Sequence, residues 1–133
     1  MASAIPKAGL TDTDILIDAQ HGVPQAGPFL ASQQAAGGIL ISIITAMELV
    51  AGCPNAAALA KVQAFLKGVT VLPISPLASQ NAYQLMESFS LSHGLAIADA
   101  LIAATASEHG LTINTRNVRH FQMIPGLVVI CPY

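Results

Sequence analysis

The stretch GLAIADALIAATASEHGLTIN, residues 94–114, predicts a helix that is followed directly by a strand. Eight of the nine residues from 96 to 104 are aliphatic, and the ninth is Asp99. The spacing predicts a buried helix over residues 96–110, ended by glycine, and a strand over residues 111–114. An ionised carboxylate among aliphatic side chains loses its hydration, which is costly unless a partner compensates. Asp99 is therefore expected to face a specific partner.

The same alternation of helix-like and strand-like runs continues through the rest of the chain. Short apolar runs, such as GILISI at residues 38–43, are separated by longer runs with helical character. This order is typical of a parallel sheet that helices cover on both faces. We predict an α/β fold, a three-layer α/β/α sandwich with a central, mostly parallel sheet, as a single domain over residues 1–133. The predicted strands cover residues 9–11, 38–43, 69–74, 111–114 and 127–131, and the predicted helices begin near residue 14 and cover 25–36, 44–52, 55–68, 75–94 and 96–110.

The composition indicates a chain with little charged surface. Hydrophobic residues make up 53% of the sequence and charged residues only 9%, against roughly 25% in an average soluble protein. Such a surface is expected to be covered in part by a partner or a second copy, so we predict a homodimer.

The apolar run ILISIITAM ends at Glu48 and is much shorter than the roughly 18 residues of a membrane span. We expect a cytoplasmic protein without a signal peptide or membrane segment. The two cysteines, Cys53 and Cys131, do not have the spacing of metal ligands.

The charged residues exclude one mode of nucleic-acid binding and favour another. A formal net charge of −2, with only five lysines and arginines, argues against binding driven by charge alone. A site that contacts phosphates through a metal ion stays open. Ligands of open α/β sheets bind beyond the carboxyl ends of the strands, where Asp12, Glu48, Asp99 and Thr115 are expected to lie. Three carboxylates brought together repel one another, whereas Mg²⁺ prefers such oxygen ligands, so we predict that Asp99 faces a metal ion.

Four segments together resemble a known family. They are TDTDILID at 11–18, ISIITAMELVAG at 41–52, GLAIADALIAATASEHGLTINTRNVRHF at 94–121 and IPGLVVI at 124–130. In this order and spacing they are similar to the signature segments of PIN-domain proteins, specifically VapC-type toxins. The resemblance implies a metal-dependent endoribonuclease that is usually a homodimer and is held inactive by a cognate antitoxin. It further implies that RNA phosphodiesters are hydrolysed by water that the metal ion activates.

The resemblance also implies which residues form the site. Asp12, Glu48 and Asp99 match the three catalytic acids of the family, which would bind Mg²⁺ or Mn²⁺. Asn117 falls where many members carry a fourth aspartate, and its side-chain oxygen remains a possible ligand that adds no charge. His120 occupies another position at which aspartate is common, so neither residue supplies a fourth carboxylate.

Three further residues match supporting positions of the family, and two arginines are candidates for contact with RNA. Thr13 and Asp14 match the polar pair after the first acid, and Thr115 matches the hydroxyl residue that supports the site from the fourth strand. Arg116 and Arg119 are positioned to contact an RNA phosphate as charge-assisted donors.

Structural roles compete with these functional ones. Asp99 is equally suited to cap the helix that it begins, and Asp14 is a natural N-cap for the first helix. Asp18 is expected to be a solvated helix residue, and His120 is expected to pack a short turn with the next residue. Glu48 has apolar sequence neighbours, which favours a function over a structural role.

Two other function classes remain as alternatives. The DTD motif after a strand also resembles the nucleophile pair of haloacid-dehalogenase-like phosphatases, but Lys61 and Lys67 lie on an amphipathic helix and no later acidic pair follows. A PIN-like protein-binding module that hydrolyses RNA poorly is the non-enzymatic alternative. Binding of Mg²⁺ or Mn²⁺ that depends on Asp12 and Asp99 would distinguish the nuclease from this module.

Overall fold

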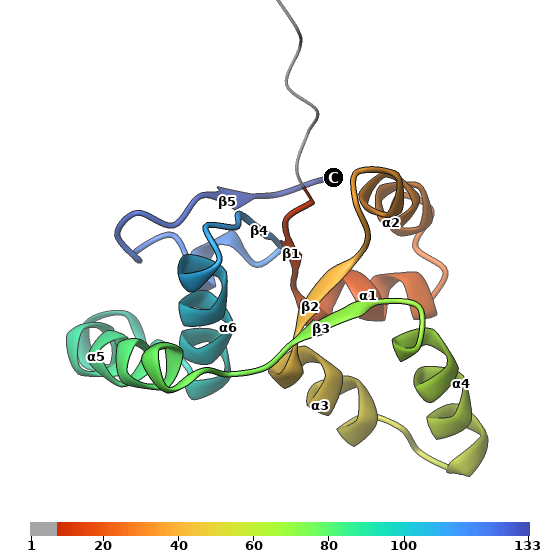
Figure 1. The fold of residues 1–133 in the computed structure, drawn as a ribbon, viewed down its shortest axis with the longest axis horizontal. Coiled ribbons are helices and arrows are strands. Elements are labelled where there is room, and N and C mark those ends of the chain that lie inside the picture. Colours follow the sequence, from red (N-terminus) through yellow and green to blue (C-terminus); the bar gives the residue numbers. More distant parts are fainter. Residues whose placement is uncertain (1–7) are drawn as a thin grey trace, which may run out of the picture.

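A parallel five-stranded sheet forms the centre of the computed structural model, which describes residues 8–133 (Figure 1). The strand order is β3-β2-β1-β4-β5, and every neighbouring pair is parallel. Each strand contains only two or three residues, so the predicted strands extend beyond the observed ones by one or more residues. The strands are β1 (Leu10–Thr11), β2 (Leu40–Ser42), β3 (Thr70–Leu72), β4 (Ile113–Asn114) and β5 (Val129–Ile130).

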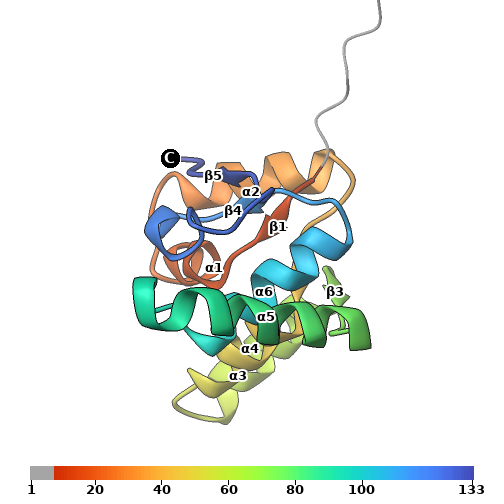
Figure 2. The ribbon, with the colours of Figure 1, turned by 90° about the vertical axis from the view of Figure 1, so that its left-hand side faces the viewer.

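Helices cover both faces of the sheet, which confirms the predicted α/β fold. In Figure 1, α5 and α6 lie on one side of β1 and β2, and α1, α2 and α4 lie on the other. Figure 2 shows the same molecule from the side of α5, with α6 between α5 and the sheet. No helix within the described residues is both long and apolar enough to cross a membrane. The helices are α1 (Thr13–Gln20), α2 (Ala26–Ala35), α3 (Ile43–Ala51), α4 (Ala56–Leu66), α5 (Pro76–His93) and α6 (Ile97–Glu108), with a 3₁₀ turn η1 (Val118–His120) before β5.

Two apolar cores hold these layers together. Leu40 and Ile41 are adjacent in β2 and pack into different cores, because successive side chains of a strand point to opposite faces of a sheet. The core between the sheet and α5 and α6 contains Leu10, Ala82, Ile102, Ile113 and Phe121, and the core among α1, α3 and α4 contains Leu16, Ile41, Leu49 and Val62.

Local signals in the sequence set several helix ends. Asn55 and Ser75, each predicted to begin a helix, accept hydrogen bonds at 2.9 and 3.0 Å from the backbone N–H three residues on. Pro76 occupies the first turn of α5, where its missing N–H is not needed. Gly94 ends α5 with φ +65°, a left-handed conformation that favours glycine.

The sheet has a switch point at the carboxyl end of β1. The chain passes from β1 to β2 on one side and returns to β4 on the other side of β1, and ligands of open α/β sheets bind beyond the strand ends at such a point. Thr11 pairs with Asn114, and the Asp12 N–H donates to the Asn114 carbonyl at 2.9 Å. The residues that directly follow the two strands, Asp12 and Thr115, are therefore neighbours.

Gly9 lies against the side chains of Thr112 and Asn114, and a methyl group at this position is expected to destabilise the fold. A Cβ atom on Gly9 would lie 2.5 Å from Thr112 Oγ1 and 2.6 Å from Asn114 Nδ2. Asn114 is not free to move, since its Nδ2 and the Gly9 N–H both donate to Gln33 Oε1, at 3.2 and 2.9 Å. We expect Gly9→Ala to cost about 1–3 kcal/mol of unfolding free energy. Denaturant melts of Gly27→Ala, where the new Cβ meets nothing within 4 Å, supply the control, and equal stability of the two variants would refute the close approach.

Candidate active site

Asp12 joins β1 to α1. Its backbone is extended, with φ −73° and ψ 157°, and its Oδ1 accepts a hydrogen bond from the Thr13 N–H at 2.8 Å. Its Oδ2 accepts a second bond, also of 2.8 Å, from the Thr115 hydroxyl. Asp12 therefore caps α1. The prediction that Asp14 is the cap is wrong, because the helix begins only one residue after the strand ends, at Thr13.

Burial controls the charge of Asp12, whose exposed fraction is 5%. Loss of hydration and then the negative charge of Asp14 raise its pKa from the usual 3.8, and the charge of Asp99 adds to this. Hydrogen bonds from Thr115 and Thr13 act in the opposite direction, and the resulting pKa is about 7. A carboxylate with such a pKa is strongly stabilised by a cation placed beside it.

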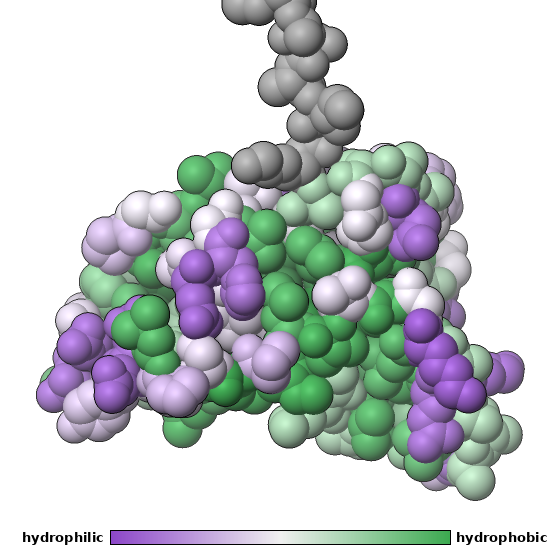
Figure 3. All heavy atoms as spheres, in the orientation of Figure 1, coloured by the Kyte–Doolittle hydropathy of each residue, from purple (hydrophilic) through white to green (hydrophobic). Residues whose placement is uncertain are grey.

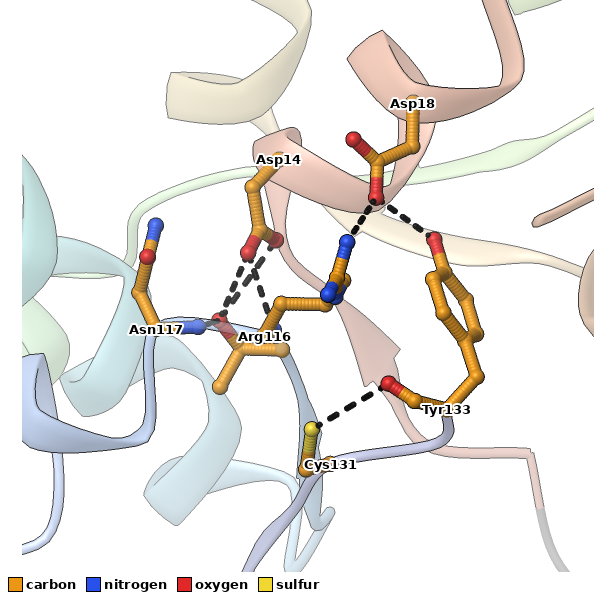
Figure 4. Close-up of polar contacts among 7 residues, drawn as sticks. Asp14, Asp18, Arg116, Asn117, Cys131 and Tyr133 are labelled. Carbon is orange, nitrogen blue, oxygen red and sulfur yellow. Dashed lines mark hydrogen bonds and ion pairs between the residues drawn. The ribbon is translucent and has the colours of Figure 1, made fainter. Parts of the chain in front are cut away.

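Asp14 is held by the loop that follows β4 (Figure 4). Its Oδ2 accepts a hydrogen bond from the Arg116 N–H at 2.8 Å and lies 3.3 Å from the Thr115 hydroxyl. The Thr115 oxygen accepts a further bond from the Asn117 N–H at 3.0 Å. Since the Thr115 proton serves one carboxylate at a time, the shorter contact to Asp12 is the stronger one. Thr115 thus connects the start of α1 to the end of β4.

The Glu48 carboxylate is held near the end of β1 by the Thr13 hydroxyl, which also contacts the Thr45 hydroxyl. The Thr13 hydroxyl lies 2.7 Å from Glu48 Oε1 and 2.9 Å from the Thr45 hydroxyl. Thr45 was not predicted, although its spacing of three from Glu48 places both on one face of α3. The premise that Glu48 lies among buried apolar side chains is wrong, because Met47 and Val50 are exposed and Glu48 itself reaches solvent, while its functional role stays a prediction. What fixes Glu48 is its hydrogen bond to Thr13.

Asp99 lies in the first turn of α6 but does not cap it. The cap position is Ala96, which makes no side-chain hydrogen bond, so the prediction of a capping role for Asp99 is wrong. Asp99 Oδ2 instead lies 3.2 Å from Nδ1 of His120, whose side chain is 55% exposed. The predicted packing role of His120 belongs to its neighbour Phe121, which is fully buried. His120 is therefore available to the site.

The charge state of Asp99 depends on the same group of side chains. Burial raises its pKa, the nearby His120 lowers it, and the negative charge of Glu48 raises it again, with a net upward direction. Together with Asp12, this gives two aspartates whose pKa values are both raised. The four acids near this edge of the sheet, Asp12, Asp14, Glu48 and Asp99, thus repel one another.

The acids form a loose group rather than a tight coordination shell. Within residues 8–133, no three histidine, cysteine, aspartate or glutamate side chains are close enough to hold a metal ion directly. The group still fits a hydrated divalent cation, since Mg²⁺ takes oxygen ligands and keeps several waters. Burial, and after it the repulsion between the acids, raises the pKa values of Asp12 and Asp99, and a bound cation would favour their ionised forms.

Comparison with known proteins gives the family. The sequence model of the PIN domain matches residues 10–126. The chain belongs to the PIN domain family. It is 34% identical over 119 residues to Ribonuclease VapC10 of Mycobacterium tuberculosis, covering 89% of each protein. It is 35% identical over 120 residues to Ribonuclease VapC19 of the same organism, covering 89% of this chain and 95% of the relative.

Solved structures agree with this assignment. A toxin–antitoxin complex from Klebsiella pneumoniae contains a chain with 32% identity and a TM-score of 0.77, and the match covers 94% of this chain and 98% of that one. The predicted resemblance to PIN-domain proteins of the VapC type is confirmed. Membership of the PIN family disfavours the phosphatase-like alternative.

The PIN domain contains a second polar cluster beside the acids, which the sequence did not reveal (Figure 4). Arg116 Nη1 lies 3.4 Å from Asp18 Oδ2, and the Arg116 guanidinium lies over the Tyr133 ring, 5.1 Å from its centroid. The Tyr133 hydroxyl donates to Asp18 Oδ2 at 2.9 Å. Burial, followed by this hydrogen bond, raises the pKa of Tyr133 to about 12. Asp18 is thus paired, and the prediction of a solvated residue is wrong.

The remaining predicted residues lie on the loop after β4. The Asn117 side chain rises from this loop on the side of Asp14 (Figure 4). Asn117 and Arg119 are both exposed. Arg116, predicted to contact a phosphate, is directed to Asp18 and Tyr133 in this structure, whereas Arg119 faces solvent.

Loss of the Thr115 hydroxyl is expected to weaken cation binding. Thr115→Val keeps the shape of the side chain but removes the 2.8 Å hydrogen bond that favours ionised Asp12. We expect the affinity for Mn²⁺ to fall about 10-fold, the usual effect of losing a group that orients a ligand. Titration calorimetry measures this affinity, with Thr105→Val as the control, because Thr105 is equally buried but bonds to Leu101 within α6. Unchanged affinity in Thr115→Val would contradict the expected role.

Proposed function

We propose that this PIN domain is a divalent-metal-dependent endoribonuclease and the toxin of a toxin–antitoxin pair. The observation that carries the proposal is the pair Asp12 and Asp99, which lie at the switch-point end of the sheet with raised pKa values. Perturbed carboxylates at such a place are typical of sites that bind cations or move protons. The names of the two mycobacterial relatives and the toxin–antitoxin complex of similar fold support the same activity.

In this proposal Asp12 and Asp99 hold Mg²⁺ or Mn²⁺, while Glu48 and Asn117 contribute oxygens directly or through water. Such an ion, when bound, neutralises charge on a phosphodiester and lowers the pKa of nearby water. The chain's own contribution is to fix the acids. Both Asp12 oxygens are held, one by a backbone N–H and one by a threonine hydroxyl.

Glu48 is proposed to orient the attacking water. Its Oε1 is fixed by the Thr13 hydroxyl at 2.7 Å, which leaves the carboxylate at the solvent-facing side of the site. A carboxylate there accepts a hydrogen bond from water and takes up its proton as the oxygen attacks phosphorus. As the new bond forms, the bond from phosphorus to the 3′ oxygen breaks and the departing oxygen takes a proton from solvent water, which gives 5′-phosphate and 3′-hydroxyl ends.

Two arginines are proposed to contact the RNA backbone. Arg119 is exposed in the same short turn as His120 and suits a charge-assisted contact with phosphate. Arg116 forms an ion pair with Asp18 at a partly exposed position. Because surface ion pairs contribute little free energy, an RNA phosphate can compete with Asp18 for Arg116.

An apolar groove supports a protein partner, proposed to be the cognate antitoxin. The groove has a volume of about 690 Å³ and lies among α1, α2, α3 and α4, where Figure 3 shows apolar side chains gathered. The same groove also favours the alternative of a binding module that hydrolyses RNA weakly. Its lining includes Leu16, Ile17, Leu30, Leu49, Val62 and Phe65, with Lys61 and Glu48 among the polar residues.

We also propose that the chain is a homodimer. Tyr83, Leu91 and Ile97 expose large apolar side chains on α5 and at the start of α6. Burial of such side chains against a second copy would remove apolar surface from water. Light scattering at micromolar concentration is expected to give the mass of two chains, and a clean monomer would contradict the proposal.

Expression in a bacterial host, alone and with the cognate antitoxin, tests the toxin function. Expression alone is expected to stop growth and to produce discrete RNA fragments, and co-expression of the antitoxin is expected to restore growth. Growth arrest without RNA fragments would instead favour the binding module. Normal growth with a folded, soluble chain would contradict the proposed function.

A further inference from the structure

A histidine lies beside the acids at a position where it can bind a metal ion. His120 Nδ1 is 3.2 Å from Asp99 Oδ2. Two ligands at right angles on one ion, with bonds of about 2.1 Å, are separated by about 3 Å. The spacing of the two atoms therefore already matches that of neighbouring ligands on one ion. His120 is half-exposed, so its ring can rotate toward an incoming ion without disturbing a packed core.

The backbones that carry these two side chains are anchored. Phe121, next to His120, is fully buried in the core beneath α6, and its N–H donates to the Val118 carbonyl at 3.1 Å. Asp99 is followed in α6 by Ala100, which is also fully buried. The contact between the two side chains is therefore set by packed elements on both sides and not by a mobile loop.

We propose that His120 is a nitrogen ligand that makes this site select a first-row transition ion, such as Mn²⁺ or Co²⁺, over Mg²⁺. The inference rests on the proposed function, because it concerns the same ion site. Imidazole nitrogen binds transition ions well, whereas Mg²⁺ strongly prefers oxygen. Asp12, Asp99 and Glu48 supply only three carboxylates, and His120 adds a donor of a different kind. Affinity should also increase from Mn²⁺ to Co²⁺.

Thermal melts and pulsed electron paramagnetic resonance of the full chain test this inference. MgCl₂, MnCl₂ and CoCl₂ are titrated against wild type, His120→Asp and His120→Ala. His109→Ala is the control, because His109 is exposed at the opposite end of α6 from Asp99. In the wild type and the control, we expect Mn²⁺ and Co²⁺ to raise the melting temperature at concentrations at least 10-fold lower than Mg²⁺ does. The resonance spectrum of bound Mn²⁺ is expected to contain coupling to a histidine nitrogen.

The variants separate the role of His120 from that of the acids. In His120→Asp the preference for Mn²⁺ over Mg²⁺ should fall about 10-fold while an ion still binds, and in both variants the nitrogen coupling should disappear. Mn²⁺ binding to the wild type without nitrogen coupling would overturn the inference and leave the proposed function intact. Nitrogen coupling without RNA cleavage would support the inference and overturn the nuclease. If no ion changes any melting temperature, both are overturned.

Discussion

Asp99→Asn is expected to reduce RNA cleavage at least about 100-fold while the protein stays folded. Asparagine has nearly the same shape as aspartate but lacks the charge that binds a cation. The substitution removes the charge of a partly buried acid beside the switch point, and with it the ionic part of the contact with His120. Cleavage of a defined RNA by purified protein, at saturating Mn²⁺, gives the rate.

The stability of Asp99→Asn is expected to change little. Asp99 makes no capping hydrogen bond, so the loss of its charge removes the favourable interaction with the helix dipole, about 0.3–1 kcal/mol, and the charge of its partly exposed contact with His120, which contributes little. Removing a carboxylate whose pKa is raised by burial acts in the opposite direction. Glu87→Gln on the exposed face of α5 is the matched control, since it deletes the same charge away from the site. Equal cleavage rates for the two variants would show that Asp99 takes no part in the reaction.

Asp12→Asn is expected to be inactive and yet more stable than the wild type when no metal is present. The pKa of Asp12 rises from the usual 3.8 to about 7 in the folded chain. Between these two pH values the folded state binds a proton that the unfolded state releases, so the stability of the wild type falls as pH increases from about 4 to about 7. At pH 8 the folded protein carries the full cost of ionised Asp12.

The size of this effect follows from the pKa change. One pKa unit corresponds to about 1.4 kcal/mol, so ionised Asp12 costs on the order of 4 kcal/mol. Asparagine removes this cost and caps helices as well as aspartate does, which preserves the start of α1. We expect the melting temperature of Asp12→Asn in chelator to exceed that of the wild type by on the order of 10 °C at pH 8, and by much less at pH 4.5.

Melts of both proteins with added Mn²⁺ complete this test. The ion is expected to stabilise the wild type at pH 8 and to leave Asp12→Asn unchanged. Glu87→Gln should follow the wild type at every pH, because its side chain is exposed. A lower melting temperature for Asp12→Asn than for the wild type at pH 8 in chelator would mean that ionised Asp12 stabilises the folded chain, which contradicts this prediction.

The sequence predicted the parts of this site that depend on chain order and strand direction. Residues after parallel strands meet at one edge of a sheet, so the proximity of Asp12 and Thr115 follows from the two strand-like runs that precede them. The buried helix around Asp99 also follows from its aliphatic spacing. These features need no knowledge of distant contacts.

The sequence did not predict which side chains meet within that edge. Whether Asp12 or Asp14 caps α1 depends on the single residue at which the strand stops, and propensity does not resolve one residue. Tyr133 lies 115 residues from Asp18, and no spacing rule relates them. The contact of Asp99 with His120 depends on how a turn packs through Phe121, which only the tertiary structure reveals.

Removal and return of the metal ion during RNA cleavage tests the central claim most directly. Purified, antitoxin-free chain is incubated with a mixed pool of transfer and ribosomal RNA, first with Mn²⁺ or Mg²⁺, then with excess chelator, and finally with the ion restored. The account predicts discrete cleavage that stops with chelator and resumes when the ion returns. Cleavage that continues in chelator, or a folded and ion-loaded chain that cleaves no RNA, would contradict it.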